Sequence, residues 1–370
     1  MAHSQTDDRV VMTLDAGGTN FVFSAMAAHR EVVEPFTLPS RASELDVSLR
    51  TLVEGFERVR GACPRPPVAI SFAFPGPCDY ASGVVVGPVN LTGYRNVPLG
   101  PMLEDRFGIP VFINNDGDLF SVGEAAAGLL PHVNGLLEQA GSPKRYRNLV
   151  GFTVGTGFGC GIVHDGRLFN GDNSLGGEAW LLKHKLEPTR NVEEGVSIRA
   201  VRNAYAAFAG VPVADVPDPR AIAAIARGEH PGDADAARQA FARLGEVAGD
   251  AIAAVTTLVD ALVVIGGGLA AAHRLFVPSL VGEMNGCYRT PTGEPLRRLV
   301  QVVFDLEEPA QLEGFLHGRP MRLEVPGSNR QVSFDALQRT GVGISRLGTS
   351  RAVAIGAYAH ALTHLPQGDR

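Results

Sequence analysis

The stretch VVMTLDAGGTNFVFSAM (residues 10–26) indicates the fold class of the chain. Apolar and β-branched residues fill both of its ends, and the glycine-containing segment AGGTN separates them. This pattern predicts two strands joined by a tight turn. Glycine lets the backbone approach a ligand closely, and successive N–H groups in such a turn form an anion site.

The turn itself contains residues that suit a phosphate group. We expect Asp15, at the end of the first strand, to hold Mg²⁺ through water, and Thr19 to donate to a phosphate oxygen. Gly17 and Gly18 would let the backbone come close. An ordinary hairpin turn favours the same residue types, so this motif alone leaves both interpretations open.

A second unit of the same kind covers residues 148–169, where NLVGFTV is followed by GTGFG and CGIVHDGRLF. The two units together suggest one phosphate-binding hairpin per domain. A dinucleotide fingerprint requires a helix after the glycines, whereas the residues here continue as a strand. An NAD-dependent oxidoreductase is therefore disfavoured.

Strands and helices alternate along the rest of the chain, which is typical of an α/β fold. Residues 44–60 have helical spacing of apolar side chains, and residues 66–77 (PPVAISFAFPGP) form a predicted buried strand ended by prolines. Later, ALVVIGGG runs as a strand into three glycines and a helix. Those glycines, 266–268, suit close backbone approach to a flat nucleoside.

The segment VFINNDG (residues 111–117) places an acidic residue directly after a predicted strand. Asp116 can there accept the proton of a substrate hydroxyl as the hydroxyl attacks phosphorus. Asn115 can bond neighbouring hydroxyls. Asn-Asp-Gly is also a common turn, so this motif too has a purely structural alternative.

Composition excludes several classes of protein. The 370 residues are 45% hydrophobic and 19% charged, with a net charge of −6, which suits two soluble domains and argues against a nucleic-acid partner. We find no signal peptide, and Asp260 interrupts the most apolar stretch, so we expect no membrane span. The four cysteines form no CxxC pair, which favours reduced thiols and a cytoplasmic location.

Taken together, five motifs resemble the ROK family (repressor, open reading frame, kinase) of sugar kinases, within the actin-like ATPase and ribonuclease H-like superfamily. They follow the family's order and span nearly the whole chain. They are DAGGTN, FPGPCDYASGVVVGPVNL, NNDGDLFSVGEA, VGTGFGCGIVHDGRLFNGDNSLGGEAW and VVIGGGLAAAHRLFVPSL.

The resemblance implies an ATP- and Mg²⁺-dependent kinase acting on a hexose or hexosamine, at the hydroxyl on C6. Asp116 would be the general base, and Asn90, Asn115 and Glu178 would bind the sugar. A further sugar contact would come from Glu193 or Glu194, of which we select Glu194. The residues expected around ATP and its metal are Asp15, Gly17, Gly18, Thr19, Thr156, Gly157 and Gly267.

The resemblance also implies two α/β domains that close over a cleft. We expect residues 1–125, completed by the helix 350–365, to form one domain, and residues 126–349 to form the other. A β-rich addition around 285–345 is longer than we expect for the family. The chain has only about ten residues before its first strand, so a DNA-binding repressor is disfavoured, and we expect a homodimer.

One departure from the family concerns zinc. Many members carry a histidine three residues after the sugar-binding glutamate, and that histidine binds sugar and a structural zinc. Leu181 stands at that position here, and residues 182–199 contain no cysteine. We therefore expect no zinc site, a solvated His184, and a loop held by apolar packing of Trp180, Leu181 and Leu182.

The lost histidine keeps a second function open, namely a non-catalytic sugar-binding or regulatory protein on the same fold. The intact Asp116 and the glycine motifs count against it. The sequence does not select among glucose, N-acetylglucosamine, mannose, fructose and allose, because these sugars differ by single hydroxyls, an acetamido group or the form of the ring.

Overall fold

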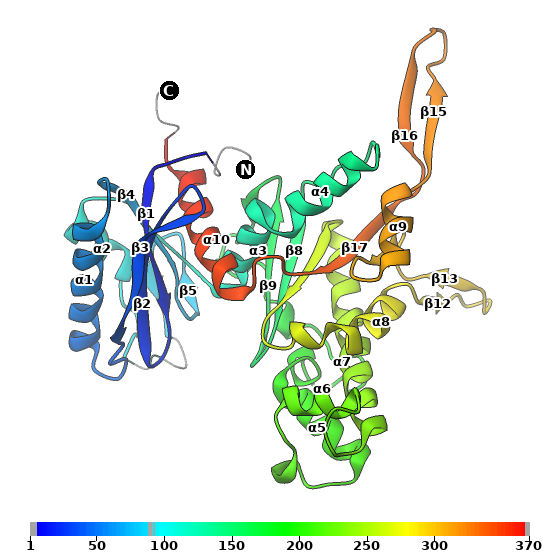
Figure 1. Cartoon of the computed structure of the whole chain (residues 1–370), viewed down its shortest axis with the longest axis horizontal. Coiled ribbons are helices and arrows are strands. Elements are labelled where there is room, and N and C mark those ends of the chain that lie inside the picture. Colours follow the sequence, from blue (N-terminus) through cyan, green and yellow to red (C-terminus); the bar gives the residue numbers. More distant parts are fainter. Residues whose placement is uncertain (1–5, 88–90, 92, 367–370) are drawn as a thin grey trace. The chain divides into compact units, whose positions relative to one another are not determined.

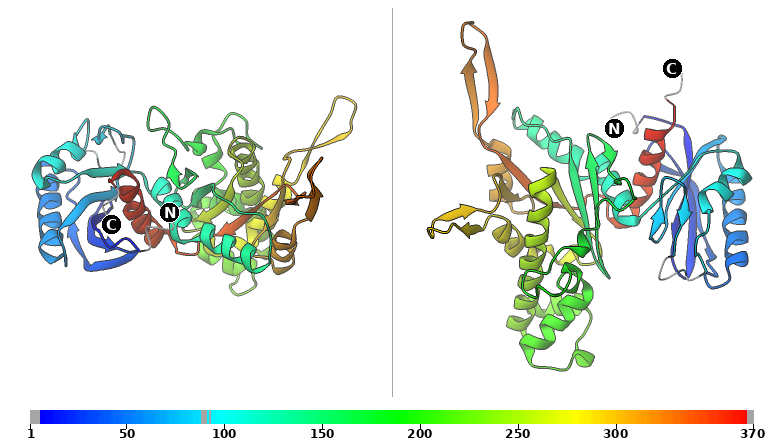
Figure 2. Two further views of the ribbon diagram at one scale, coloured as in Figure 1. Left: turned by 90° about the horizontal axis from the view of Figure 1, so that it is seen from above. Right: turned by 180° about the vertical axis from the view of Figure 1, so that it is seen from behind.

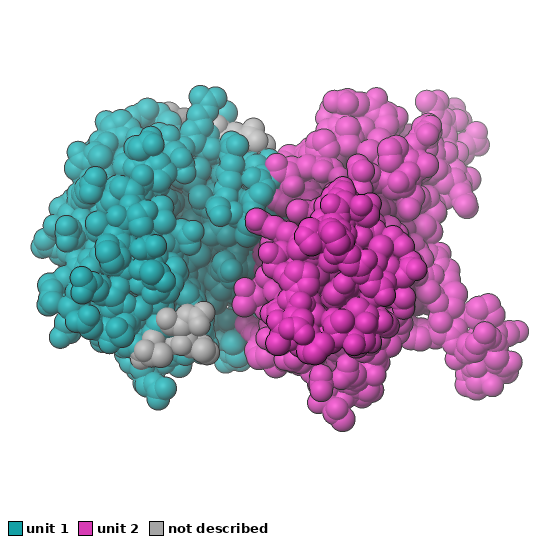
Figure 3. Space-filling view, turned by 60° about the horizontal axis from the view of Figure 1, so that its bottom comes forward, with its two compact units in different colours: residues 1–128, 161–177, 347–370 teal, residues 129–160, 178–346 magenta. Residues whose placement is uncertain are grey.

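The computed structural model describes residues 6–87, 91 and 93–366, and these residues group into two compact units. Residues 1–128, 161–177 and 347–370 make up the first unit, and residues 129–160 and 178–346 make up the second; Figure 3 colours them teal and magenta. The predicted α/β class is confirmed, because each unit combines a sheet that contains parallel strands with helices (Figure 1).

The first unit is built on a five-stranded sheet of order β3-β2-β1-β4-β7. The pairs β1–β2 and β2–β3 are antiparallel, and β1–β4 and β4–β7 are parallel. The strands are β1 (Val10–Ala16), β2 (Asn20–Ala27), β3 (Arg30–Pro39), β4 (Pro67–Ala73) and β7 (Val111–Asn114). Because parallel strands present their carboxyl ends at one edge, β1 and β7 deliver Asp15 and Asp116 to the same edge of the sheet.

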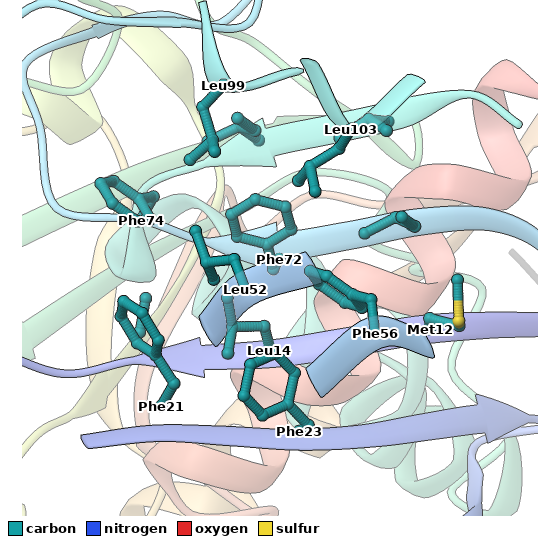
Figure 4. Packing of buried hydrophobic residues seen from close by; sticks show 14 of the residues in the cluster. Met12, Leu14, Phe21, Phe23, Leu52, Phe56, Phe72, Phe74, Leu99 and Leu103 are labelled. Atoms are coloured by element: carbon teal, nitrogen blue, oxygen red, sulfur yellow. The ribbon is translucent and has the colours of Figure 1, made fainter. Parts of the chain in front are cut away.

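Alternation of side chains decides how this sheet is covered. Every second residue of β1, β2 and β4 points to one face, where large apolar side chains pack with helix α1 (Leu45–Ala62) and helix α2 (Leu99–Phe107). Figure 4 shows this packing. Phe23 and Phe56 meet edge to face with ring centroids 5.3 Å apart, and Gly55 makes room for the Phe23 ring.

The other face of the sheet is covered by helix α10 (Thr349–His364), which in turn packs on helix α3 (Asp116–Ala127). Two glycines bring these helices into backbone contact. A β-carbon at Gly123 would lie 1.9 Å from the carbonyl oxygen of Ala352, and one at Gly356 would lie 1.8 Å from that of Leu119. No side chain fits at either position, so α3 has a fixed place against α10.

The second unit contains the parallel strands β8, β11, β17 and β14, and the complete sheet has the order β10-β9-β8-β11-β17-β14. These strands are β8 (Leu149–Val154), β9 (Phe158–His164), β10 (Arg167–Leu168), β11 (Leu262–Gly266), β14 (Val302–Asp305) and β17 (Arg339–Ile344). The helices are α4 (Leu129–Gln139), α5 (Ile198–Ala209), α6 (Pro219–Ala226), α7 (Ala234–Val259), α8 (His273–Met284) and α9 (Pro309–His317). Apolar residues from Phe241 to Ile252 form the buried stripe of α7.

Short elements complete both units. In the first unit, β5 (Cys78–Asp79) pairs with β6 (Val84–Val85). In the second, the predicted β-rich addition forms two hairpins, β12 (Cys287–Arg289) with β13 (Pro295–Arg297) and β15 (Pro320–Glu324) with β16 (Gln331–Asp335). No helix among the described residues is long and apolar enough to cross a membrane.

The contact between α3 and α10 is open to a direct test. Gly356→Ala should lower the free energy of unfolding by about 1–3 kcal/mol or more, because the new methyl group has no space beside Leu119. Thermal and urea denaturation would measure the loss. In the same unit, Gly61→Ala near the end of α1 is the matched control. Its methyl group meets nothing within 4 Å, so stability should stay or rise by up to about 1 kcal/mol. Equal effects of the two changes would contradict the contact.

Candidate functional site

Two carboxylates, Asp15 and Asp116, lie at the carboxyl edge of the first unit's sheet and line one cavity of about 830 Å³. Surrounding protein atoms that displace water raise the pKa of Asp15, and the negative charge of Asp116 raises it further. Thr13, Ser24 and Ser350 also line the cavity. A divalent cation held beside the two carboxylates would offset their repulsion, so these residues suit Mg²⁺.

Asp116 is the first residue of α3, and its carboxylate is exposed to solvent. The carboxylate therefore lies at the N-terminus of α3, where the helix dipole interacts favourably with negative charge. Asn115 is the N-cap of α3, where its Oδ1 accepts a hydrogen bond from Asp118 N at 2.6 Å. The side-chain N–H₂ group of Asn115 is the part left for a ligand hydroxyl.

The turn between β1 and β2 is braced from one side. Ser40, which is buried, donates its backbone N–H to the Thr19 carbonyl at 2.9 Å and its hydroxyl to the Gly18 carbonyl at 2.6 Å. A carbonyl and the next N–H point in opposite directions in a trans peptide. The N–H groups of Thr19 and Asn20 therefore point away from Ser40, as an anion site at this turn requires.

Asn170, which the sequence analysis did not single out, joins this region of the first unit. Its Nδ2 donates to Oδ1 of the buried Asn114 at 3.2 Å. The segment that follows is closed by a bond from Gly176 N to the Asn170 carbonyl, and Ser174 Oγ accepts from Tyr80 N. Residues 170–177 are thus fastened beside the strand end that leads into Asp116.

In the second unit, the predicted GTGFG turn lies between β8 and β9. Gly155 N donates to the Gly157 carbonyl at 3.0 Å, and Ile198 N donates to the Gly155 carbonyl at 2.7 Å. Thr156 is exposed at the tip. Gly267, after β11, has φ of 88°, and a β-carbon there would lie 2.4 Å from the carbonyl oxygen of Val154. Only glycine fits this approach between the two strand ends.

The two adjacent glutamates Glu193 and Glu194 have different surroundings. Glu193 Oε2 accepts from Phe158 N at 3.1 Å and lies 2.7 Å from the place of a β-carbon on Gly157. Arg199 forms ion pairs with both, with Glu194 at 2.7 Å and with Glu193 at 4.0 Å. Of the pair, Glu193 is the one that contacts the glycine turn.

Glu178 precedes the short helix η1 (Ala179–Leu181), and its carboxylate accepts a hydrogen bond from the indole N–H of Trp180. Glu178 is therefore hydrogen-bonded to the residue two positions later in the chain. Leu181, where the resemblance predicts a histidine in many members, is 58% exposed. Asn90, also predicted to bind sugar, lies outside the described residues.

The loop after η1 corrects two predictions. His184 was expected in solvent but is buried, 2% exposed, and its Nδ1 accepts from Leu186 N and Glu187 N at 3.1 and 3.0 Å. Its ring lies against Gly195. Apolar packing by Trp180, Leu181 and Leu182 was expected to hold the loop. Leu181 is exposed, so the prediction is wrong for this residue, whereas Trp180 and Leu182 are half-buried. A buried imidazole that satisfies two backbone donors also holds the loop.

No group of three or more histidine, cysteine, aspartate or glutamate side chains in the described part of the chain is arranged to hold a metal ion. A Mg²⁺ ion bound at Asp15 alone would be held in a different way, because Mg²⁺ keeps several water ligands.

Known proteins resemble this chain at the level of sequence and structure. The model of the ROK family matches residues 11–305. The crystal structure of a glucokinase from Parabacteroides distasonis is 50% identical, with a TM-score of 0.90 over 98% of this chain and 99% of that chain.

Two curated relatives match more distantly. A glucokinase of Halalkalibacterium halodurans is 27% identical over 46% of this chain and 49% of its own length. An N-acetylmannosamine kinase of Citrobacter koseri is 28% identical over 55% of this chain and 63% of its own length. The chain thus spans less than two thirds of the length of either relative.

Removing the His184 side chain should loosen the loop it holds. His184→Ala should lower the free energy of unfolding by roughly 2–4 kcal/mol, because two backbone donors lose their acceptor and a cavity opens. Burial lowers the pKa of His184 below its ordinary value of 6.5. Its contribution is therefore full above that pH and declines as pH falls below it.

Denaturation of the wild type and the variant between pH 5 and pH 8 would measure both effects. His164→Ala, at an exposed position, is the control and should have little effect. Chelator treatment should leave the melting temperature unchanged once Mg²⁺ is restored. Stoichiometric zinc in the purified protein, with unfolding on its removal, would contradict this account of the loop.

Proposed function

The chain belongs to the ROK family, and we therefore propose that it transfers a phosphoryl group from ATP to a hydroxyl of a hexose or hexosamine. The observation that carries the proposal is the pair Asp15 and Asp116, which lie at the carboxyl edge of the sheet and line one cavity. One carboxylate is suited to a hydrated metal ion and the other to a substrate proton. Phosphoryl transfer to a hydroxyl uses both.

The proposed base is Asp116. It accepts the proton of the sugar hydroxyl while the oxygen forms a bond to the γ-phosphorus, and the bond from that phosphorus to the bridging oxygen of ADP breaks. The products are a sugar phosphate and ADP, and Asp116 then releases its proton to water. The position of Asp116 directly after a strand, in the same cavity as Asp15, supports this role.

The proposed nucleotide ligands come from three glycine-containing turns. In the first unit Gly18 and Thr19 offer backbone N–H groups, while the N–H of Gly17 donates to the Asn20 carbonyl at 2.9 Å and closes the turn. In the second unit the proposed residues are Thr156, Gly157 and Gly267. Asp15 holds Mg²⁺ through water in this proposal. The metal supplies charge neutralisation at the phosphates, and the turns position them.

The proposed sugar ligands are Asn115, Glu178 and Asn90, with one of the adjacent glutamates. Asn115 offers its N–H₂ group, since its oxygen caps α3. Glu178 is oriented by the Trp180 indole. Glu194 is the residue selected from the sequence, and Glu193, which accepts from Phe158 N at the GTGFG turn, is the alternative; both are within ion-pair distance of Arg199.

We propose the C6 hydroxyl as the acceptor and glucose as the first sugar to test, because the 50% identical neighbour is a glucokinase. The N-acetylmannosamine kinase among the relatives makes N-acetylated sugars the next to test. The proposal includes a cytoplasmic location, where ATP is available and where the free thiols Cys63, Cys78, Cys160 and Cys287 stay reduced. It also keeps two domains, residues 1–125 with 350–365, and residues 126–349.

The second candidate is a sugar-binding regulator without catalysis. Leu181 favours it, because its exposed side chain offers no polar group to a sugar. An ATP-coupled assay over a panel of hexoses and N-acetylhexosamines, with product analysis by NMR, separates the two functions. Turnover of one sugar, with phosphate on C6, supports the kinase. Sugar binding without ADP release would favour the regulator.

Substitution of the base gives a sharper test. Asp116→Asn should lower kcat by roughly 10²–10⁴-fold on the best sugar, with sugar binding largely kept, because only proton acceptance is lost. Steady-state kinetics and sugar-binding calorimetry measure the two effects. Asp165→Asn, at an exposed turn, removes the same charge elsewhere and should leave kcat unchanged. A normal kcat in Asp116→Asn would exclude this residue as the base.

The nucleotide site can be tested separately. Gly157→Val should weaken Mg-ATP binding by about tenfold or more, because the side chain occupies space where the backbone approaches phosphate and displaces Glu193. Calorimetry with Mg-ATP and circular dichroism would follow binding and folding. Gly282→Val in α8, where a β-carbon meets nothing within 4 Å, should bind Mg-ATP normally. Unchanged affinity in a folded Gly157→Val protein would argue against a phosphate site at this turn.

A further inference from the structure

The β15–β16 hairpin projects from the rest of the second unit as a long two-stranded arm (Figures 1 and 2). It lies after residue 305, where the match to the family model ends. No other strand of the described chain pairs with either β15 or β16. An isolated two-stranded hairpin is only marginally stable in water, so an arm of this kind gains from additional strands.

The base of the arm is fixed to its unit. Asp335 accepts hydrogen bonds from Arg319 N and Leu337 N and pairs with the guanidinium of Arg339. That guanidinium is buried and also donates to the Phe315 carbonyl at 2.6 Å. The arm therefore leaves the second unit in a defined direction and presents fixed surfaces.

One face of the arm is apolar. Met321 lies opposite Phe334, and Leu323 lies opposite Val332, so all four side chains share a face. Each is 42–47% exposed. The other face carries polar side chains, with Arg322 opposite Ser333 at its centre.

The hydrogen-bond pattern shows which backbone groups point outward. Val325 N donates to the Arg330 carbonyl, and Ala336 N donates to the Arg319 carbonyl. Bonded pairs alternate in an antiparallel ladder, so Met321 with Phe334 and Leu323 with Val332 are also bonded pairs. The groups that point away from the partner strand are those of residues 320, 322 and 324 on β15 and of residues 331, 333 and 335 on β16.

The two edges differ in what they offer to another strand. On β15, Pro320 has no N–H group, and the next two outward positions are the charged Arg322 and Glu324. Proline and charge are features that protect an edge strand from pairing. On β16, Gln331 and Ser333 are uncharged and each has an N–H group. The edge of β16 is thus the unprotected one. The strands of the other hairpin, β12 and β13, have three residues each. Both strands contain an arginine, and β13 begins with Pro295.

We propose that two copies of this chain associate through β16, antiparallel about Ser333, to form a four-stranded sheet of order β15-β16-β16-β15. Ser333 then exchanges both backbone hydrogen bonds with Ser333 of the second copy, and Gln331 lies opposite Asp335. No like charges meet in this register. The same arrangement at β15 would place Arg322 against Arg322, which disfavours it.

A second copy suits this edge because β16 is complementary to itself under a two-fold axis, the usual symmetry of homodimers. The axis runs perpendicular to the sheet, so the apolar faces of the two arms lie on the same side and adjoin. Four exposed apolar side chains from each copy become one continuous surface. This proposal is independent of the reaction that the chain catalyses.

Analytical ultracentrifugation of the full chain should find a dimer, and Ser333→Pro should weaken it at least about tenfold, because each copy loses a backbone donor. The Ser333 N–H points outward, so this change spares the bonds within the arm. Arg322→Pro is the matched control, since it changes the outward position of the opposite strand in the same cross-strand pair. It should leave the dimer intact.

Charges at the centre of the pairing test the register. Ser333→Arg and Ser333→Glu should each dimerise weakly alone, and mixing them should restore association, because unlike charges then meet across the axis. A monomeric wild type, a dimer that survives Ser333→Pro, or equal loss of dimer in Arg322→Pro would each overturn the proposal. A mixture of the Ser333→Arg and Ser333→Glu variants that does not associate would overturn it as well.

Discussion

The backbone contact between α3 and α10 is the constraint on which the arrangement of the first unit depends. Gly123 and Gly356 let the two helices touch at main-chain atoms, so neither helix can slide or rotate against the other. Asp116 is the first residue of α3. Helix α10 covers the sheet whose strand β1 carries Asp15 near its end. The relative position of Asp15 and Asp116 therefore depends on Gly123 and Gly356, two glycines that are not part of the site.

Sequence patterns were sufficient for the parts of the site that depend on short-range order. The glycine turns and the strand before Asp116 follow from periodicity and turn chemistry. The bond from Asn170 to Asn114 and the contact of Glu193 with the GTGFG turn join residues 35 or more positions apart. No local pattern encodes such pairs, because they depend on how the strands and loops pack.

The loop after Glu178 shows how one buried imidazole can do the structural work expected of apolar packing. His184 accepts two backbone N–H groups that would otherwise be unsatisfied, and Gly195 leaves room for its ring. Flanking lysines made a solvated histidine the natural sequence prediction. His184 is buried partly because of α7, whose Val247 lies near Gly195 as the His184 ring does. The loop sequence alone does not contain that information.

The hydrogen bond from Trp180 to Glu178 has an optical consequence. Trp180 is the sole tryptophan of the chain, so ultraviolet emission excited at the red edge of protein absorption arises from one indole. The N–H group of that indole donates to the carboxylate of Glu178. A ligand that draws the carboxylate away, or that shields the half-buried ring from water, changes the intensity and colour of the emission. The chain thus contains its own fluorescent probe at a single glutamate, without any label.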